Sequence, residues 1–245
     1  RHEAAAERVS HQMAQLVPVV TPTPYLLAKG IAAHVGVMTD EAGQKTYIPA
    51  FDPEEKPWTL QAIETDGSKR FAKDSRKAGC FHPLGGFAAL AAAPVLVIAE
   101  GYATAATLAE ALGQATVAAF DSSNLPAVAW ALHEKYPEKP IIIAGDDDRH
   151  LKATQGITPG RLKAKEAAEA VDGRALFPIF APGEQRADPK AFTDFNDLAT
   201  KSTLGQAGVE RQVKAAVKKV LLDQGERQQT KHLAQAKRRR PARIG

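Results

Sequence analysis

The hydrophobic pattern of the chain changes near residue 94. Before that point, short runs such as 45–51 and 58–64 mix apolar and polar residues and are separated by turn sequences. Runs of this kind predict a small antiparallel sheet. After that point, continuous apolar runs, VLVIA at 95–99 and IIIA at 141–144, alternate with stretches of helical period. Apolar strands that alternate with helices predict a parallel sheet covered by helices on both faces.

These patterns divide the chain into five expected segments. They are an N-terminal helix and linker (1–24), a small α+β subdomain (25–93), a larger α/β domain (94–204), a C-terminal helix (205–225) and a flexible basic tail (226–245). In the α/β domain, the predicted strands are 95–99, 116–120, 141–144 and 175–179. The predicted helices are 103–112, 125–135 and 159–171, and a basic loop is predicted at 149–158.

The C-terminal end of the chain carries a concentration of positive charge. The 245 residues include 32 Lys and Arg against 28 Asp and Glu, a net charge of +4, and the segment 226–245 is far more basic than the rest. Its densest part is the cluster Lys237, Arg238, Arg239 and Arg240. Such a cluster binds the phosphate backbone of nucleic acids, and a solvated tail is the alternative interpretation.

Several classes of protein are excluded by the same sequence. Cys80 is the only cysteine, so neither a disulfide framework nor a cysteine-rich zinc site can form from this chain. The longest uncharged apolar run, 87–99, contains Pro94 and is shorter than the roughly 20 residues that cross a bilayer. The N-terminal residues lack the apolar segment of a secretion signal, so we expect a protein of the cytoplasm without membrane contact.

Acidic residues follow three of the predicted strands. Glu100 follows the first strand, Asp121 follows the second, and Asp146, Asp147 and Asp148 follow the third. Ligands of parallel α/β sheets bind at the carboxyl ends of the strands. In an extended backbone Asp146 and Asp148 point to one side and Asp147 to the other, so the pair could share a divalent cation such as Mg²⁺. A turn and helix cap is the alternative.

Two further groups of charged residues are candidates for a site. Asp194 and Asp197 lie in the sequence DFND before the last predicted helix, where a helix N-cap is the alternative. A basic ridge surrounds a predicted strand, and it consists of Lys69, Arg70, Lys73, Arg76 and Lys77. These side chains could hold template phosphates or a nucleoside triphosphate, and a solvated rim is the alternative.

The order of these residues resembles a known domain. Glu100-Gly101 after an apolar strand, with Asp146 and Asp148 after a later strand, resembles the TOPRIM domain of topoisomerases, primases and some nucleases. The words YLLAKGI, EGYATAATL, SNL at 123–125 and DFNDLA at 194–199 are similar to those of TOPRIM primases from bacterial plasmids, conjugative elements and phages. The resemblance covers about Tyr25 to Leu222.

This resemblance implies an α/β fold, with the TOPRIM catalytic domain at 94–204 and the smaller α+β subdomain before it. It implies a DNA primase core that makes short RNA primers on single-stranded DNA from ribonucleoside triphosphates, with Mg²⁺ or Mn²⁺. Related primases carry an N-terminal zinc-binding module, but we expect no zinc in this chain because Cys80 is its only cysteine. Glu100 would be an acid/base or metal-positioning residue, and Asp146 and Asp148 would bind the metal. Asp194 and Asp197 would be outer contacts to metal or nucleotide.

The resemblance also implies contacts with nucleic acid and with other proteins. Lys69 and Arg70 match a basic motif of related primases, and we expect Asn124 of the SNL word to contact nucleotide or DNA, together with the cluster at 237–240. A further N-terminal domain, a helicase or a relaxase would be a partner. Two alternatives stay open, a non-catalytic nucleic-acid-binding TOPRIM module of a larger mobilisation protein and a TOPRIM nuclease.

Overall fold

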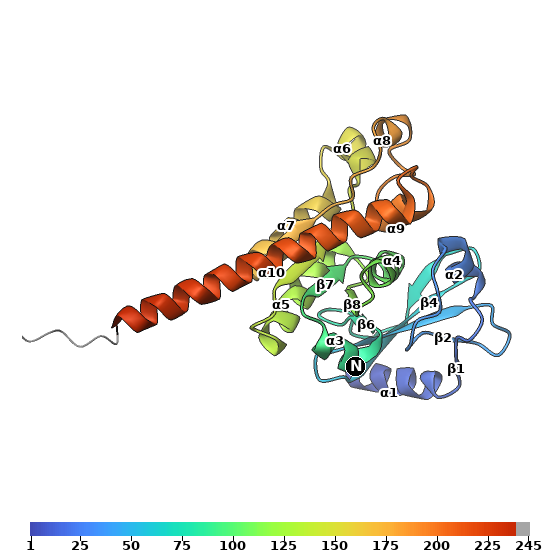
Figure 1. Ribbon diagram of the computed structural model, residues 1–245. Helices are drawn as coiled ribbons and strands as arrows, with labels where there is room; N and C mark the ends of the chain where they lie inside the picture. The colour runs from blue at the N-terminus through green and yellow to red at the C-terminus, as the bar shows by residue number, and fades with distance from the viewer. Residues whose placement is uncertain (239–245) are drawn as a thin grey trace, which may run out of the picture.

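A computed structural model describes the backbone of residues 1–238, and the side chains of these residues except 153–155 and 231–238. Its first sheet has five antiparallel strands in the order β1-β2-β3-β4-β5 (Figure 1). They are β1 (Val17–Pro18), β2 (Met38–Thr39), β3 (Thr46–Phe51), β4 (Pro57–Ile63) and β5 (Lys69–Phe71). The antiparallel sheet expected from the turn-rich first part of the chain is therefore confirmed.

Helices α1 (His2–Met13) and α2 (Pro24–Lys29) accompany this sheet. The ends of α2 follow from its sequence, because Thr23 caps its N-terminus and Gly30, with φ of 60°, ends it in the left-handed conformation. The first 24 residues differ from a separate helix and linker, since α1 contacts β4 and β1 pairs with β2.

The second sheet has the strand order β10-β9-β7-β8-β6. Its strands are β6 (His82–Leu84), β7 (Leu96–Ala99), β8 (Thr116–Ala118), β9 (Ile141–Ala144) and β10 (Arg174–Leu176). All neighbouring pairs are parallel except β6, which runs antiparallel to β8 at one edge. The predicted parallel sheet is confirmed, and the residues expected to lie in the α+β subdomain add an antiparallel edge strand to it.

Helices cover both faces of the second sheet, as predicted. Helices α4 (Tyr102–Leu112) and α10 (Gly205–Arg238) contact one face, and α5 (Leu125–Lys135) and α7 (Pro159–Ala170) contact the other. Side chains of the central strands alternate between the two hydrophobic cores, with Val97 and Ala99 in one and Leu96 and Ile98 in the other. Both faces being buried explains why these strands are continuously apolar.

The remaining helices lie between strands and near the carboxyl end of the sheet. They are α3 (Gly86–Ala92), the short 3₁₀ helix η1 (Ser122–Asn124), α6 (Arg149–Gln155), α8 (Glu184–Ala187) and α9 (Phe195–Thr200). The loop predicted at 149–158 is therefore mostly helical. Within the residues that the structure describes, no helix is both long enough and apolar enough to cross a membrane.

Helix α10 corrects the predicted C-terminal region. We expected the helix to end at residue 225 and a flexible tail to follow, but α10 continues to Arg238 and extends beyond the rest of the molecule (Figure 1). Residues 226–238 are rich in Gln, Lys, Ala and Arg and contain no proline, so they favour a helix even where nothing covers it. The lack of an apolar face after residue 225 therefore did not predict where the helix ends.

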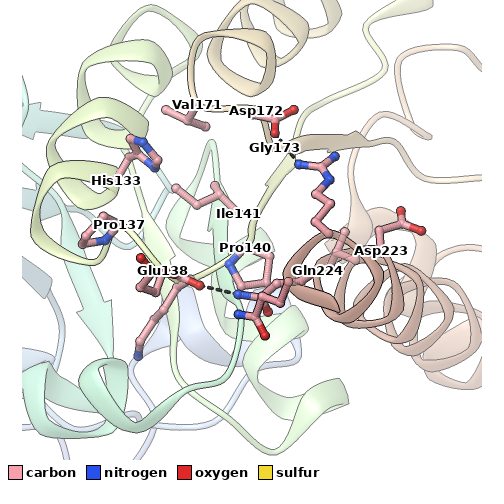
Figure 2. A pocket seen from close by; sticks show the side chains of 14 residues that line it. His133, Pro137, Glu138, Pro140, Ile141, Val171, Asp172, Gly173, Asp223 and Gln224 are labelled. Atoms are coloured by element: carbon pink, nitrogen blue, oxygen red, sulfur yellow. Dashed lines mark hydrogen bonds and ion pairs between the residues drawn. The ribbon is translucent and has the colours of Figure 1, made fainter. Parts of the chain in front are cut away.

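A cavity of about 210 Å³ lies where α10 passes the amino ends of the strands (Figure 2). Gln224 donates a hydrogen bond to the carbonyl oxygen of Glu138, and Arg227 pairs with Asp172. These contacts attach α10 beside Ile141, the first residue of β9. The cavity is therefore at the opposite end of β9 from the acidic residues that follow the strand.

Candidate active site

Glu100 connects the ends of three neighbouring strands. It directly follows β7, and the backbone amides of Ser122, after β8, and Asp146, after β9, act on its carboxylate and lower its pKa. Because β7 lies between β8 and β9 in a parallel arrangement, their carboxyl ends meet at one edge of the sheet. The sequence-based prediction that acidic residues gather at this edge is confirmed.

The N-terminus of α7 packs closely against these carboxylates at Gly160. A Cβ atom on Gly160 would lie 2.9 Å from the carbonyl oxygen of Asp146, 3.1 Å from Asp148 Oδ2 and 3.3 Å from Glu100 Oε2. Oxygens from three acidic residues therefore lie against the Gly160 backbone, where there is no room for a side chain. Since Gly160 is the second residue of α7, the partial positive charge of the helix end also faces them.

Burial and mutual repulsion raise the pKa values of this group. Burial raises the pKa of Glu100 to about 7, with a further contribution from the negative charge of Asp148. Burial also raises the pKa of Asp146 well above its usual value, and Glu100 and Asp194 add to the effect. The pKa of Asp148 is raised mainly by burial. Four neighbouring acids that are costly to ionise together form a site that a cation would stabilise.

Two carboxylate oxygens at this site lack hydrogen-bond partners among the described residues. They are Glu100 Oε2 and Asp146 Oδ1, and both are buried. In the part of the chain that the structure describes, no three histidine, cysteine or carboxylate side chains already stand in a metal-binding arrangement. The carboxylates thus offer unpaired oxygen donors, which suit a hard divalent cation.

Asp147 points away from this group and into a separate network. Arg149 Nε donates to its Oδ2 at 2.9 Å, Gln185 Nε2 donates to the same oxygen at 3.1 Å, and Arg161 Nη1 lies 3.0 Å from its Oδ1. Its backbone N–H donates to the carbonyl oxygen of Thr193 at 2.7 Å. The predicted opposition of Asp147 to its two neighbours is confirmed, and the residue fixes the position of the loop.

Asp194 and Asp197 form the capping box of α9. Asp194 Oδ1 accepts from the N–H of Asp197 at 2.7 Å, and Asp197 Oδ2 accepts from the N–H and hydroxyl of Thr193. Lys201 Nζ lies 2.7 Å from the other Asp197 oxygen. The capping alternative therefore describes both residues, with Asp194 as the N-cap and Asp197 as its partner in the first turn. The charges of both also act on Asp146, and that of Asp194 has the larger effect.

The basic ridge divides into residues near the carboxylates and residues held elsewhere. Lys69 is the ridge residue whose charge interacts with Asp194 and Asp146, and partial burial followed by repulsion from Lys29 lowers its pKa. Lys77 is paired with Asp121, and the Arg76 guanidinium lies 4.8 Å from the centre of the Trp58 ring. Arg70 and Lys73 are exposed.

Asn124 has a structural role in place of the expected contact with nucleotide. Its Oδ1 accepts from the N–H of Gly79 at 2.8 Å, and its Nδ2 donates to the carbonyl oxygens of Cys80 and Ala119, each at 2.9 Å. The amide is buried and ties the segment after the ridge to the end of β8. The other expected nucleic-acid contacts, the side chains of Lys237 and Arg238 and the whole of Arg239 and Arg240, lie outside the described residues.

Sequence reasoning missed three residues that the fold places at the site. Tyr25 and Lys29 are the first and last non-proline residues of α2, and both interact electrostatically with Asp194. Gly160 lets the start of α7 approach the carboxylates closely. None of the three lies in a motif that periodicity could identify, since α2 and α7 come to the site only through tertiary packing. The word YLLAKG, which contains Tyr25 and Lys29, was the one available signal.

The sequence of the chain is similar to a known domain family and to two named proteins. A family model described as Toprim domain matches residues 95–203. Two proteins of Escherichia coli named DNA primase TraC are similar to most of the chain, one 53% identical over 96% of it and the other 54% identical over 92%. The chain spans only 27% and 19% of the lengths of these relatives.

Among solved structures, the primase fragment of the bacteriophage T7 primase-helicase protein aligns with 78% of this chain. The alignment covers 73% of that structure, with a TM-score of 0.49 and 17% identity. The family assignment itself comes from the sequence matches. Residues 95–203 therefore match the Toprim domain family, and the chain as a whole is similar to a segment of the proteins named DNA primase TraC.

Proposed function

We propose that this chain is the catalytic section of a DNA primase that acts in plasmid replication or conjugation in the bacterial cytoplasm. It would join ribonucleoside triphosphates into short RNA primers on single-stranded DNA. The observation that carries this proposal is the set of buried, mutually repelling carboxylates at the ends of β7 and β9, in a chain 53% identical to a protein named DNA primase TraC.

The carboxylates fit a divalent cation, Mg²⁺ or Mn²⁺, on their own chemistry. Glu100 and Asp146 each present a buried oxygen without a partner among the described residues, and Asp148 adds a third acid beside Gly160. These three residues would hold the cation. When bound, it would neutralise triphosphate charge and make the attacking 3′ hydroxyl more acidic. With a pKa of about 7, Glu100 is also suited to take up a proton near neutral pH.

The cationic side chains beside the carboxylates would orient nucleotide and template. Lys69 and Lys29 stand on the side of the N-terminal sheet and interact with Asp194 at the edge of the acidic group. Arg70 and Lys73 extend this positive surface along and beyond β5. Contacts of this kind hold phosphates and fix the register of a strand without reading its bases.

The proposal is tested by incubating the chain with single-stranded DNA and labelled ribonucleotides in Mg²⁺ or Mn²⁺. We expect short labelled products that require the template and disappear when a chelator removes the metal. A pre-annealed primer is supplied in a parallel reaction, so that extension is measured apart from initiation. Cleavage of labelled oligonucleotide in Mg²⁺ without nucleotides would instead indicate a nuclease. DNA binding without initiation, extension or cleavage would indicate a non-catalytic module.

Metal binding should depend on pH in a direction set by Glu100. The pKa of this carboxyl is raised to about 7, and a cation binds the ionised form, so affinity should rise as pH increases through neutrality. We expect Mg²⁺ to increase the melting temperature of the chain more at pH 8 than at pH 6. An Asp146→Asn/Asp148→Asn variant is the control and should show no such difference. An equal shift at both pH values in the unmodified chain would contradict the assignment.

The basic end of the chain should contribute affinity for DNA without affecting the fold. Deleting 231–245 removes most of the basic residues after Glu226 but keeps Gln224 and Arg227, which attach α10 to the body. Each lost phosphate contact should flatten the salt dependence of single-strand binding by about 0.7 in log–log slope. We expect weaker binding, a flatter slope and an unchanged melting temperature. An unchanged slope would remove the DNA-binding role from this segment.

A further inference from the structure

A second positively charged region lies on the other side of the loop that carries the carboxylates. Two adjoining cavities, of about 530 and 430 Å³, share Asp147, Arg149 and Arg161 in their walls. Asp147 separates Asp146 from Asp148 in the sequence and points away from them, so the cavities begin directly behind the candidate active site. The acidic loop is therefore bordered by Lys69 on one side and by these arginines on the other.

The charge of this region is unbalanced. Its walls carry five cationic side chains, which are Arg149, Lys152, Arg161, Arg174 and Arg186. The one acidic residue in the walls is Asp147, which is fully buried and pairs with Arg149 and Arg161. Arg174, Arg186 and Lys152 are exposed and form no ion pair with a described residue. A concave surface with this excess of positive charge attracts an anion.

The positions of the five cationic side chains favour a ligand with several phosphates in a row over a ligand with one phosphate group. They come from four elements, with Arg149 and Lys152 on α6, Arg161 on α7, Arg174 on β10 and Arg186 on α8. They therefore line two open cavities and do not converge on one point. A polynucleotide backbone presents charges at such successive positions, whereas one triphosphate does not.

Apolar surface lies beside the arginines. Ile179 is 70% exposed, and the Phe177 ring is 4.1 Å from the guanidinium carbon of Arg161. Both residues line the larger cavity, and bases stack or pack on surfaces of this kind next to a charged groove. Positive charge with adjacent apolar side chains matches single-stranded nucleic acid, whose bases are unpaired, better than it matches a duplex.

We infer that these two cavities form a second contact for single-stranded nucleic acid, which continues the path of a strand past the carboxylates on the side away from Lys69. This inference rests on the proposed function for the role of the strand, but it concerns binding alone. Arg149 and Arg161 connect this second contact to the active site. Both pair with Asp147, and Asp147 fixes the loop that carries Asp146 and Asp148. A phosphate that engages either arginine would act on that loop.

The test is the salt dependence of oligonucleotide binding by an Arg174→Gln/Arg186→Gln variant, measured without nucleotides. Both side chains are exposed, so the variant should keep its melting temperature. Loss of two phosphate contacts should flatten the log–log slope by about 1.4. The matched control is Lys165→Gln/Lys218→Gln, which removes two charges from exposed residues of α7 and α10 that line neither cavity. The control should leave the slope nearly unchanged.

An unchanged slope in the arginine variant, or an equal change in the control, would overturn the inference. Weaker binding of a ribonucleoside triphosphate with an unchanged oligonucleotide slope would also overturn it, in favour of a nucleotide pocket. Failure of the proposed function has a different signature. If the unmodified chain makes no primers, but the salt dependence of oligonucleotide binding flattens in the arginine variant and not in the control, the second contact is supported. Only the proposed catalytic function is then contradicted.

Discussion

A Glu100→Gln variant is expected to lose primer synthesis while its folded state becomes more stable. The glutamine cannot ionise, so it can neither exchange a proton nor supply charge to a cation, and we expect the rate to fall by at least about 100-fold. Burial and Asp148 raise the pKa of Glu100 from its usual 4.5 to about 7. Its ionised form is therefore destabilised in the folded state relative to the unfolded state, and the substitution removes this penalty.

The sign of the stability effect sets its pH dependence. For an acid whose pKa is raised by folding, stability is lost as pH rises from the unfolded value toward the folded value, and the penalty is complete above both. At pH 8 the variant should therefore gain on the order of 1–2 kcal/mol in the free energy of unfolding. At pH 4 the two proteins should be nearly equal, because Glu100 is then protonated in both states.

Thermal unfolding without metal at pH 8 and pH 4, beside a primer synthesis assay, measures both effects. Glu169→Gln is the matched control, since Glu169 is exposed on α7 and should affect neither property. A Glu100 variant that is less stable at pH 8 would show that stabilisation of the carboxylate by the backbone amides of Ser122 and Asp146 outweighs the charge penalty. Retained primer synthesis would remove Glu100 from the catalytic group.

The acidic edge was predictable because its determinants are local. A continuous apolar run identifies a parallel strand, and the residue after the run must lie at the carboxyl end, which places Glu100 and Asp146 together. The period of two along an extended backbone was enough to separate Asp147 from its neighbours. The DFND word allowed both an N-cap and a site interpretation. In the structure Asp194 is the N-cap of α9 and Asp197 completes the capping box, and the charges of both residues also act on Asp146.

The parts that escaped prediction depend on contacts between distant segments. Strand β6 joins the second sheet only because β8, more than 30 residues later, offers an edge to pair with. Phe51 and Phe81 exchange backbone hydrogen bonds of 2.8 and 2.9 Å and connect the two sheets. This connection fixes how the ridge and Lys69 are presented to the acidic edge. Asn124 also looked available in sequence, and only the fold shows its amide fully used.

A Gly160→Ala variant is expected to lose most activity although alanine is the better helix former. The added Cβ would lie 2.9 Å from the carbonyl oxygen of Asp146, and this backbone atom cannot move without its loop. It would also crowd Asp148 Oδ2 and Glu100 Oε2, at 3.1 and 3.3 Å. Displacement of the carboxylates by about 1 Å should reduce the rate of primer synthesis by about 100-fold.

The control for this variant is the same substitution at Gly225 in α10, where a Cβ would meet nothing within 4 Å. Gly225→Ala should raise the free energy of unfolding by up to about 1 kcal/mol and leave activity unchanged. In Gly160→Ala, the helix preference of alanine should offset part of the steric cost, so the fold persists while the Mg²⁺-induced rise in melting temperature is lost. Full activity in a folded Gly160→Ala variant would mean that the carboxylates do not act from this arrangement, since only that arrangement requires the space.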